Sequence, residues 1–173
     1  MQTIYLAGPE VFLPNALEVL ANSKKLCESF GFRAFTPFDG EITEKLQLAK
    51  AKQIFEENVS LINQSDIVIA NCNPFRGACV DDGTAFEIGY AYSKKKCVFG
   101  YVSDKRTLPE IVKSKIQTKP HPSGYAIDND GFLLNEDFGN SINLMLEFSI
   151  LNSGGNLVLG DLESVLQILK NRS

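Results

Sequence analysis

The sequence has few of the residues that build metal centres and histidine-dependent nucleophilic sites. It has four cysteines, none in a Cys-x-x-Cys pair, and a single histidine, His121, in a Lys-Pro-His-Pro stretch typical of a loop. A structural zinc site is therefore not expected, nor is a Ser-His-Asp or Cys-His mechanism. Reduced thiols are expected rather than disulfides. We predict no metal site and no cofactor. The cysteines are Cys27, Cys72, Cys79 and Cys97.

Long apolar runs and an excess of positive charge are also missing. No apolar run approaches the roughly 20 residues of a membrane span, and residues 1–5 lack the basic and long apolar regions of a signal peptide. The net charge is −4 and the pI is near 5.1, which argues against nucleic-acid and anionic-membrane partners. We expect a single cytoplasmic domain over residues 1–173, with ordinary contents of hydrophobic (44%) and charged (22%) residues.

The loops lack the motifs that bind phosphate. They contain no Gly-x-Gly-x-x-Gly, no Walker A motif and no cluster of Lys and Arg. Arg76 and the turn at Gly8 are the groups that a phosphate could use. Glu10, which follows Gly8-Pro9, would place a repelling carboxylate at that turn. A ligand without phosphate is therefore favoured.

The first hundred residues alternate between strand and helix patterns. Short apolar, β-branched runs predict strands, and longer stretches with apolar residues at helical spacing predict helices. The resulting order of elements is typical of a parallel α/β sheet with right-handed crossovers. The expected strands are 2–7, 32–36, 67–70 and 97–102; the expected helices are 14–30, 43–64 and about 82–95.

The pattern weakens after Ser103. A short helix is expected over 107–115, and residues 125–134 predict either a hairpin or a turn before a fifth strand. A further helix is expected to start near residue 141, capped by Asn140 or Ser141, and an amphipathic helix covers 162–170.

Carboxylates gather where the predicted strands end. In open parallel sheets, ligands bind at the carboxyl ends of the strands, and this edge carries Asp39, Glu41, Asp81, Asp82 and Glu87. An acidic cleft without basic groups predicts either a neutral, hydroxyl-rich ligand or a divalent metal. For a sugar, one carboxylate can attack or stabilise the anomeric carbon while another handles the proton of the leaving group.

Several of these carboxylates, and also Asp66 and Tyr5 in or beside predicted strands, have a plainer structural interpretation. Asp81 and Asp82 are residues that commonly cap a helix, and Glu87 could lie on the exposed face of that helix. Asp66 could be a turn residue, and Tyr5 could be core packing. Residue types and spacing alone leave the reaction class open.

Five segments of the chain carry a resemblance to a known family. They are residues 4–12 (IYLAGPEVF), 65–70 (SDIVIA), 73–77 (NPFRG), 81–91 (DDGTAFEIGYA) and 142–145 (INLM). In this order and at these spacings, the sequence resembles the nucleoside 2-deoxyribosyltransferase family over most of its length. The resemblance implies a flavodoxin-like (Rossmann-like) doubly wound, five-stranded parallel sheet in a three-layer α/β/α sandwich.

The resemblance also implies a mechanism and its residues. Glu87 matches the nucleophile that forms a covalent deoxyribosyl intermediate, after which a second nucleobase takes the sugar. Asp81 matches the residue that exchanges a proton with the base, while Asp82 keeps its interpretation as a helix cap. The expected partners are 2′-deoxynucleosides and free nucleobases, in nucleoside salvage.

Further positions match substrate-binding residues of that family. Tyr5 matches the tyrosine that holds the nucleophile, Asp66 matches another acid of the site, and Gly8 lies in the turn after the first strand. Asn143 and Met145 match a segment that enters the site of a neighbouring subunit, which implies a homo-oligomer with shared active sites.

The base-reading position departs from the pattern of some members. Glu41 stands where those members have a glutamine, and an ionised carboxylate accepts hydrogen bonds but donates none. The preference between purines and pyrimidines is therefore open from sequence.

Two other functions compete with deoxyribosyl transfer. One is hydrolysis of the N-glycosidic bond of a deoxynucleoside 5′-monophosphate, against which Glu10 argues because it would repel the phosphate. The other is a non-catalytic nucleoside-binding domain, which would not need Glu87 as a nucleophile.

Overall fold

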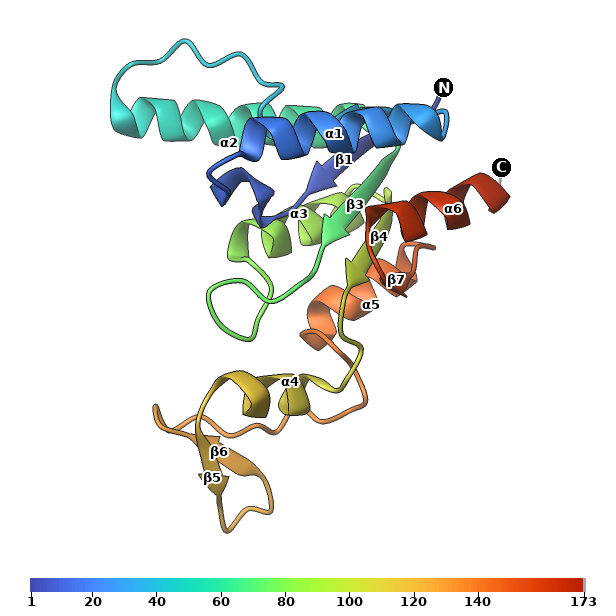
Figure 1. Ribbon diagram of the computed structural model, residues 1–173. Helices are drawn as coiled ribbons and strands as arrows, with labels where there is room; N and C mark the ends of the chain where they lie inside the picture. Colours follow the sequence, from blue (N-terminus) through green and yellow to red (C-terminus); the bar gives the residue numbers. More distant parts are fainter. Residues whose placement is uncertain (173) are drawn as a thin grey trace.

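A five-stranded parallel sheet forms the centre of the computed structural model, which describes residues 1–172 (Figure 1). The strand order is β2-β1-β3-β4-β7, and every neighbouring pair is parallel. This is the order of flavodoxin-like sheets, so the predicted fold class is confirmed. The strands are β1 (Thr3–Ala7), β2 (Arg33–Phe35), β3 (Ile67–Asn71), β4 (Cys97–Val102) and β7 (Leu157–Leu159).

Helices cover both faces of the sheet, because alternate residues of each strand point to opposite sides. Ile4 and Leu6 of β1 pack in the core cluster that includes residues of α1 (Ala16–Ser29) and α6 (Leu162–Arg172). Tyr5 and Ala7 pack in the other cluster, with residues of α2 (Gln47–Gln64), α3 (Asp82–Ser93) and α5 (Leu144–Asn152). The result is the expected three-layer sandwich.

The strand order reverses at β1. From β1 the chain continues to β2 on one side and later returns to β3 on the other side. In such sheets the crevice for a ligand lies outside the carboxyl ends of the strands at this reversal. The 3-10 helix η1 (Pro9–Phe12) follows β1 at this edge.

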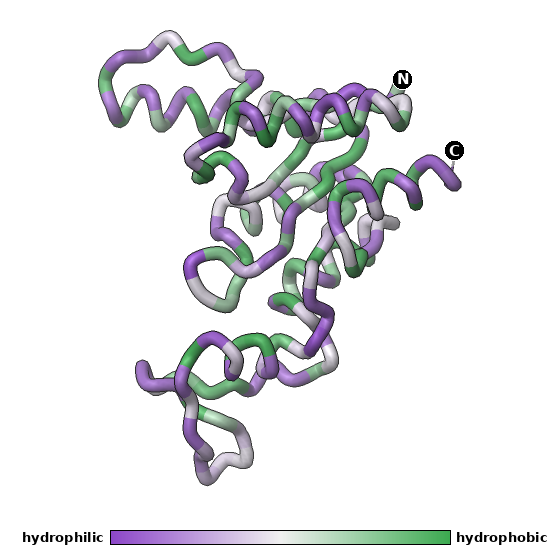
Figure 2. The backbone as a smooth tube through the Cα atoms, viewed as in Figure 1, coloured by the Kyte–Doolittle hydropathy of each residue, from purple (hydrophilic) through white to green (hydrophobic). Residues whose placement is uncertain are grey.

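Helix α2 starts later than the sequence pattern predicted. It begins at Gln47 rather than Thr43, and residues 41–46 have no helical structure. The Gln53 side chain accepts hydrogen bonds from the backbone N–H groups of Thr43 and Glu44 (3.0 Å each), which satisfies them outside a helix. Figure 2 shows hydrophobic and hydrophilic segments alternating along α2, as expected of a helix with one buried side.

An arm projects from the sheet between β4 and α5 (Figure 1). It contains α4 (Leu108–Lys115) and a two-stranded antiparallel hairpin of β5 (Thr118–Pro120) and β6 (Ala126–Asp128). Within residues 125–134 the chain turns back at 128–131, and an isolated antiparallel bridge joins Ile127 to Leu133, which confirms the hairpin interpretation of this segment. The regular strand partner of β6 is β5, which the sequence pattern did not predict. The alternative, a fifth strand of the main sheet in that segment, is wrong, because β7 fills that place.

The start of α5 also differs from the prediction. Asn143, not Asn140 or Ser141, is the N-cap, and its side chain accepts a hydrogen bond from the backbone N–H of Met145 (3.0 Å). Asn140 instead donates to the backbone oxygen of Ile142 (2.6 Å) in the preceding turn. Within residues 1–172, no helix combines the length and apolar character that crossing a membrane requires.

Candidate active site

The carboxylate of Glu87 meets the hydroxyl of Tyr5 beside the sheet. Tyr5, in β1, is fully buried, and its hydroxyl donates a 2.6 Å hydrogen bond to Glu87 Oε1. Glu87 lies one helical turn into α3, after the cap at Asp81. The strand therefore fixes the donor and the helix fixes the acceptor, so this oxygen has a defined position and the carboxylate keeps lone pairs for a reacting atom.

The surroundings of Glu87 weaken its acidity. Burial raises the pKa of Glu87 from 4.5 to about 7, with a smaller contribution in the same direction from the charge of Asp81, while the hydrogen bond from Tyr5 lowers it. Burial, and then the charge of Glu87, also raise the pKa of Tyr5 far above its ordinary value. Tyr5 therefore stays a hydrogen-bond donor at every working pH. Glu87 is ionised in a substantial fraction of molecules near pH 7, in a poorly hydrated setting that favours attack on carbon.

Asp81 is the N-cap of α3 and lines the same cavity as Glu87. Its Oδ2 accepts hydrogen bonds from the backbone N–H (2.9 Å) and the hydroxyl (3.0 Å) of Thr84. The predicted cap at Asp82 is therefore wrong. Asp82 is exposed in the first turn and accepts only from the backbone N–H of Gly83 (3.0 Å). The cap occupies one oxygen of Asp81, which leaves the other for a ligand.

Gly8 allows the turn after β1 to pack closely. A Cβ atom at Gly8 would lie 2.1 Å from the Glu10 carboxylate and 3.0 Å from Cβ of Asn71. Glu10 in turn accepts hydrogen bonds from the Asn71 side chain (2.7 Å) and the Tyr101 hydroxyl (3.2 Å). The absence of a side chain at Gly8 thus lets this polar network form at the carboxyl ends of β1, β3 and β4.

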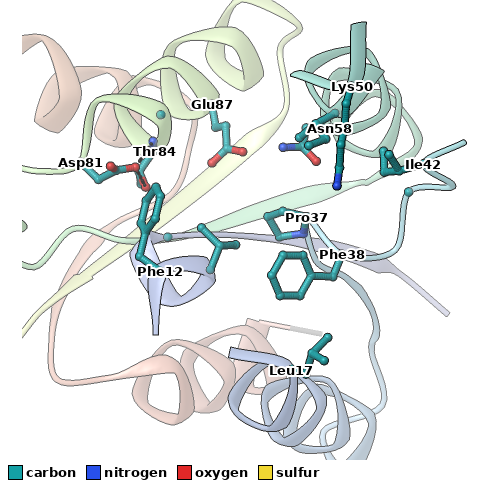
Figure 3. Close-up of a pocket in the computed structure, with 15 residues that line it drawn as sticks. Phe12, Leu17, Pro37, Phe38, Ile42, Lys50, Asn58, Asp81, Thr84 and Glu87 are labelled. Atoms are coloured by element: carbon teal, nitrogen blue, oxygen red, sulfur yellow. Dashed lines mark hydrogen bonds between the residues drawn. The ribbon is translucent and has the colours of Figure 1, made fainter. Parts of the chain in front are cut away.

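A cavity of about 710 Å³ opens in front of Glu87 (Figure 3). Its volume lies in the range of small-molecule sites. One end is polar and contains Asp81, Thr84 and Glu87; the rest has mostly apolar walls. The other lining residues are Gly8, Val11, Phe12, Leu17, Pro37, Phe38, Gly40, Ile42, Lys50, Ile54, Asn58 and Gly83.

Two polar residues of the cavity come from α2 and were not expected from the sequence. Lys50 and Asn58, with Ile54 between them, form one stripe along the helix at intervals of four residues. The Asn58 Oδ1 atom is buried without a hydrogen-bond partner. Such an atom costs about 1–3 kcal/mol unless a ligand or water donates to it. The imperfect apolar period of α2 is the only sequence signal of this stripe.

Two aromatic side chains, Phe12 and Phe38, line the cavity. Phe12 stacks on Phe75 with ring centroids 5.1 Å apart, and the Arg76 guanidinium lies 5.2 Å and 4.8 Å from the centres of these rings. Across the cavity, Phe38 is 47% exposed, which is unusual for a side chain of this size. Flat apolar surfaces of this kind suit a planar ring system.

Several predicted residues lie away from the cavity. Asp66 stands at the amino end of β3, where it accepts the backbone N–H of Thr3 (2.8 Å), at the edge opposite to the ligand crevice. Asp39 pairs with Lys24 (2.5 Å). Glu41 lies between the lining residues Gly40 and Ile42, but its side chain is not part of the wall.

Asn143 and Met145 do not reach the cavity of their own chain. Both are exposed at the start of α5, with Met145 68% exposed, and the Asn143 amide donates to Glu136 (3.0 Å). Capping of α5 accounts locally for the asparagine.

No metal centre is evident in the described part of the chain. Among residues 1–172, no group of three or more His, Cys, Asp or Glu side chains is arranged to hold a metal ion.

The chain is similar in sequence to known proteins. The model of the nucleoside 2-deoxyribosyltransferase family matches residues 4–145. An uncharacterized protein of Schizosaccharomyces pombe is 34% identical over 166 residues, covering 88% of this chain and 78% of that protein. The family-model match includes both Tyr5 and Glu87.

Solved structures share the whole fold. A 2-deoxyribosyltransferase from Leishmania mexicana superposes with a TM-score of 0.74 at 28% identity, covering 99% of this chain and 98% of that one. A conserved protein from Enterococcus faecalis gives 0.64 at 25% identity, with coverage of 100% and 99%. A CMP N-glycosidase from Clostridium botulinum gives 0.52 at 14% identity, covering 97% and 98%, and shares the fold alone. Because the family model matches most of its length, residues 4–145, the chain belongs to the nucleoside 2-deoxyribosyltransferase family.

Proposed function

We propose that the protein transfers 2-deoxyribose from a 2′-deoxynucleoside to a free nucleobase by double displacement, with Glu87 as the nucleophile. The observation that carries this proposal is the 2.6 Å hydrogen bond from the buried Tyr5 to Glu87 at the polar end of the cavity. A carboxylate held in this way, with its pKa raised by burial, suits attack on the anomeric carbon of a sugar.

In the first half-reaction a Glu87 oxygen forms a bond to C1′ while the bond from C1′ to the base nitrogen breaks. The electron pair of that bond stays on the base, which takes a proton from Asp81. In the second half, a nitrogen of the incoming base attacks C1′ and the ester bond to Glu87 breaks. The proton lost by the incoming base returns to Asp81, and two inversions give net retention.

The apolar part of the cavity supports a nucleobase as both leaving group and acceptor. The ring of Phe12 and the exposed ring of Phe38 offer flat surfaces on which a base can stack. A stacked base fills the space beside C1′, which keeps water from the covalent intermediate and favours transfer over hydrolysis.

We also propose that a second copy of the chain completes the site through Asn143 and Met145. Both residues are exposed at the start of α5, and α5 packs against α3, which carries Glu87. The two helices expose large apolar side chains, as expected of a surface that a partner covers. These are Phe86, Tyr92, Met145, Phe148 and Leu151. In this proposal the enzyme is an oligomer that works in cytoplasmic nucleoside salvage.

The test is to incubate the protein with 2′-deoxyinosine, with and without free adenine, and to separate the products by chromatography. Transfer predicts 2′-deoxyadenosine and hypoxanthine when adenine is present, and little release of hypoxanthine without it.

Other product patterns decide against transfer. Equal release of hypoxanthine with and without adenine would identify a hydrolase. Absence of turnover with several donors, by a protein that still binds them, would identify a nucleoside-binding domain.

A further inference from the structure

The base end of the cavity contains one charged group, the ammonium of Lys50. Lys50 lines the cavity together with Pro37, Phe38 and Ile42, and Figure 3 shows its nitrogen directed toward Pro37 and Phe38. The salt bridges of residues 1–172 include none to Lys50. This ammonium is therefore available to a ligand.

The position of Lys50 relative to Glu87 follows from the geometry of α2. Asn58 and Glu87 also line a smaller neighbouring cavity together, so Asn58 lies beside the nucleophile. Lys50 lies eight residues before Asn58 on the same stripe, which corresponds to about 12 Å along the helix axis. Figure 3 shows Asn58 between Glu87 and Lys50.

This spacing sets how a nucleoside fits. C1′ must lie about 3–3.5 Å from the attacking Glu87 oxygen, so the base extends from there between the apolar walls. Its edge remote from the glycosidic nitrogen then comes within reach of the long Lys50 side chain. A lysine ammonium carries three donors and no acceptor, so it complements a carbonyl oxygen and not an amino group.

We propose that Lys50 selects 6-oxopurines, such as hypoxanthine and guanine, over the 6-aminopurine adenine. The inference rests on the proposed function, because Glu87 must hold C1′ for the base to reach Lys50. On the edge formed by position 6 and N7, a 6-oxopurine presents two acceptors, O6 and N7. Adenine keeps N7 but has an amino group where O6 would be, so the ammonium meets one acceptor instead of two and lies next to another donor.

The test measures binding of free bases by isothermal titration calorimetry, in which no turnover is needed. The wild-type protein is expected to bind hypoxanthine about tenfold more tightly than adenine, the effect of one hydrogen bond to a charged group at a partly exposed site. Lys50→Met is expected to weaken hypoxanthine binding about tenfold and to leave adenine binding nearly unchanged, so the two affinities converge.

Lys52→Met is the matched control. Lys52 lies on the same helix, pairs with Glu56 at 3.5 Å and is 74% exposed, outside the cavity wall. This variant is expected to keep the wild-type affinities for both bases.

Two outcomes would overturn the selectivity assigned to Lys50: equal affinities in the wild-type protein, or a preference that persists in Lys50→Met. Failure of the proposed function has a different signature. Base binding would then keep its dependence on Lys50 while 2′-deoxynucleosides with any added base gave no transfer.

Discussion

The two ends of the cavity are built differently. At the catalytic end, Tyr5 is fully buried, Glu87 receives its hydrogen bond, and Asp81 is fixed by Thr84. At the base end, the side chains of Lys50 and Asn58 have no hydrogen bond or ion pair to other groups of residues 1–172, and Phe38 is half-exposed. The proposed catalytic end is organised by contacts within the protein, whereas the polar groups of the proposed base end are left free to pair with a ligand. The rate of the chemical step should therefore depend on the first set and binding of the base on the second, with the choice between bases depending on Lys50.

The largest expected effect comes from the nucleophile. Glu87→Gln keeps an acceptor for the Tyr5 hydroxyl but cannot form the ester, so we expect transfer to fall by about 10⁴-fold or more. Initial rates of deoxyadenosine formation from 2′-deoxyinosine and adenine measure this loss. A variant that kept a tenth of the wild-type rate would remove Glu87 from the mechanism.

The same variant has a stability signature that rules out misfolding as the cause. The folded-state pKa of Glu87 is raised to about 7 from 4.5, so its burial costs nothing at low pH, where it is protonated. The cost grows as pH rises toward the folded value and is complete above it. Glu87→Gln removes this cost. Its melting temperature should match that of the wild-type protein near pH 4 and exceed it at pH 8.

Tyr5→Phe is expected to lower kcat/KM about tenfold to a hundredfold, the effect of losing a hydrogen bond to a charged group. Because the Tyr5 hydrogen bond lowers the pKa of Glu87, its loss raises that pKa. The rise of kcat/KM with pH should therefore move to higher pH than in the wild-type protein. A profile with an unchanged midpoint would limit Tyr5 to packing.

The smallest expected effect comes from Asn58. Asn58→Leu removes a buried amide oxygen that lacks a protein partner, so stability should be unchanged or higher. If this oxygen accepts from the ligand, kcat/KM should fall about threefold to tenfold for every base, with the ratio between bases kept. Calorimetric melting together with steady-state kinetics separates the two readouts. If Asn58→Leu lowered the melting temperature as well as kcat/KM, Asn58 would be a structural residue.

The sequence singled out the polar end of the cavity, but not Lys50 and Asn58, for a physical reason. Asp81 and Glu87 belong to one short segment in which a carboxylate among apolar residues is conspicuous, and Tyr5 lies in a strand with a clear pattern. Lys50 and Asn58 come from an amphipathic helix, where a lysine or asparagine is ordinary. Only the packing of α2 against the sheet turns their stripe toward the cavity.

The errors in the fold have similar causes. β7 has only three residues, Leu157–Leu159, which are too few for a distinct periodic signal. The longer segment 125–134 pairs with strands of the projecting arm and not with the main sheet. The family resemblance matches Asp66 to an acid of the site, but in this structure Asp66 precedes β3, so its side chain lies at the amino edge of the sheet. Sequence order places a residue near a strand, and the direction of the strand decides which edge it occupies.

The most direct test of the central claim is to trap the covalent intermediate. A donor with an electron-withdrawing fluorine at C2′ slows formation and breakdown of the glycosyl ester by destabilising the oxocarbenium-like transition state. After incubation without acceptor and an acid quench, intact-mass and peptide analysis should place one fluorinated sugar on Glu87 of the wild-type protein and none on Glu87→Gln. Continued release of the base with no adduct, or an adduct on Asp81, would contradict the account.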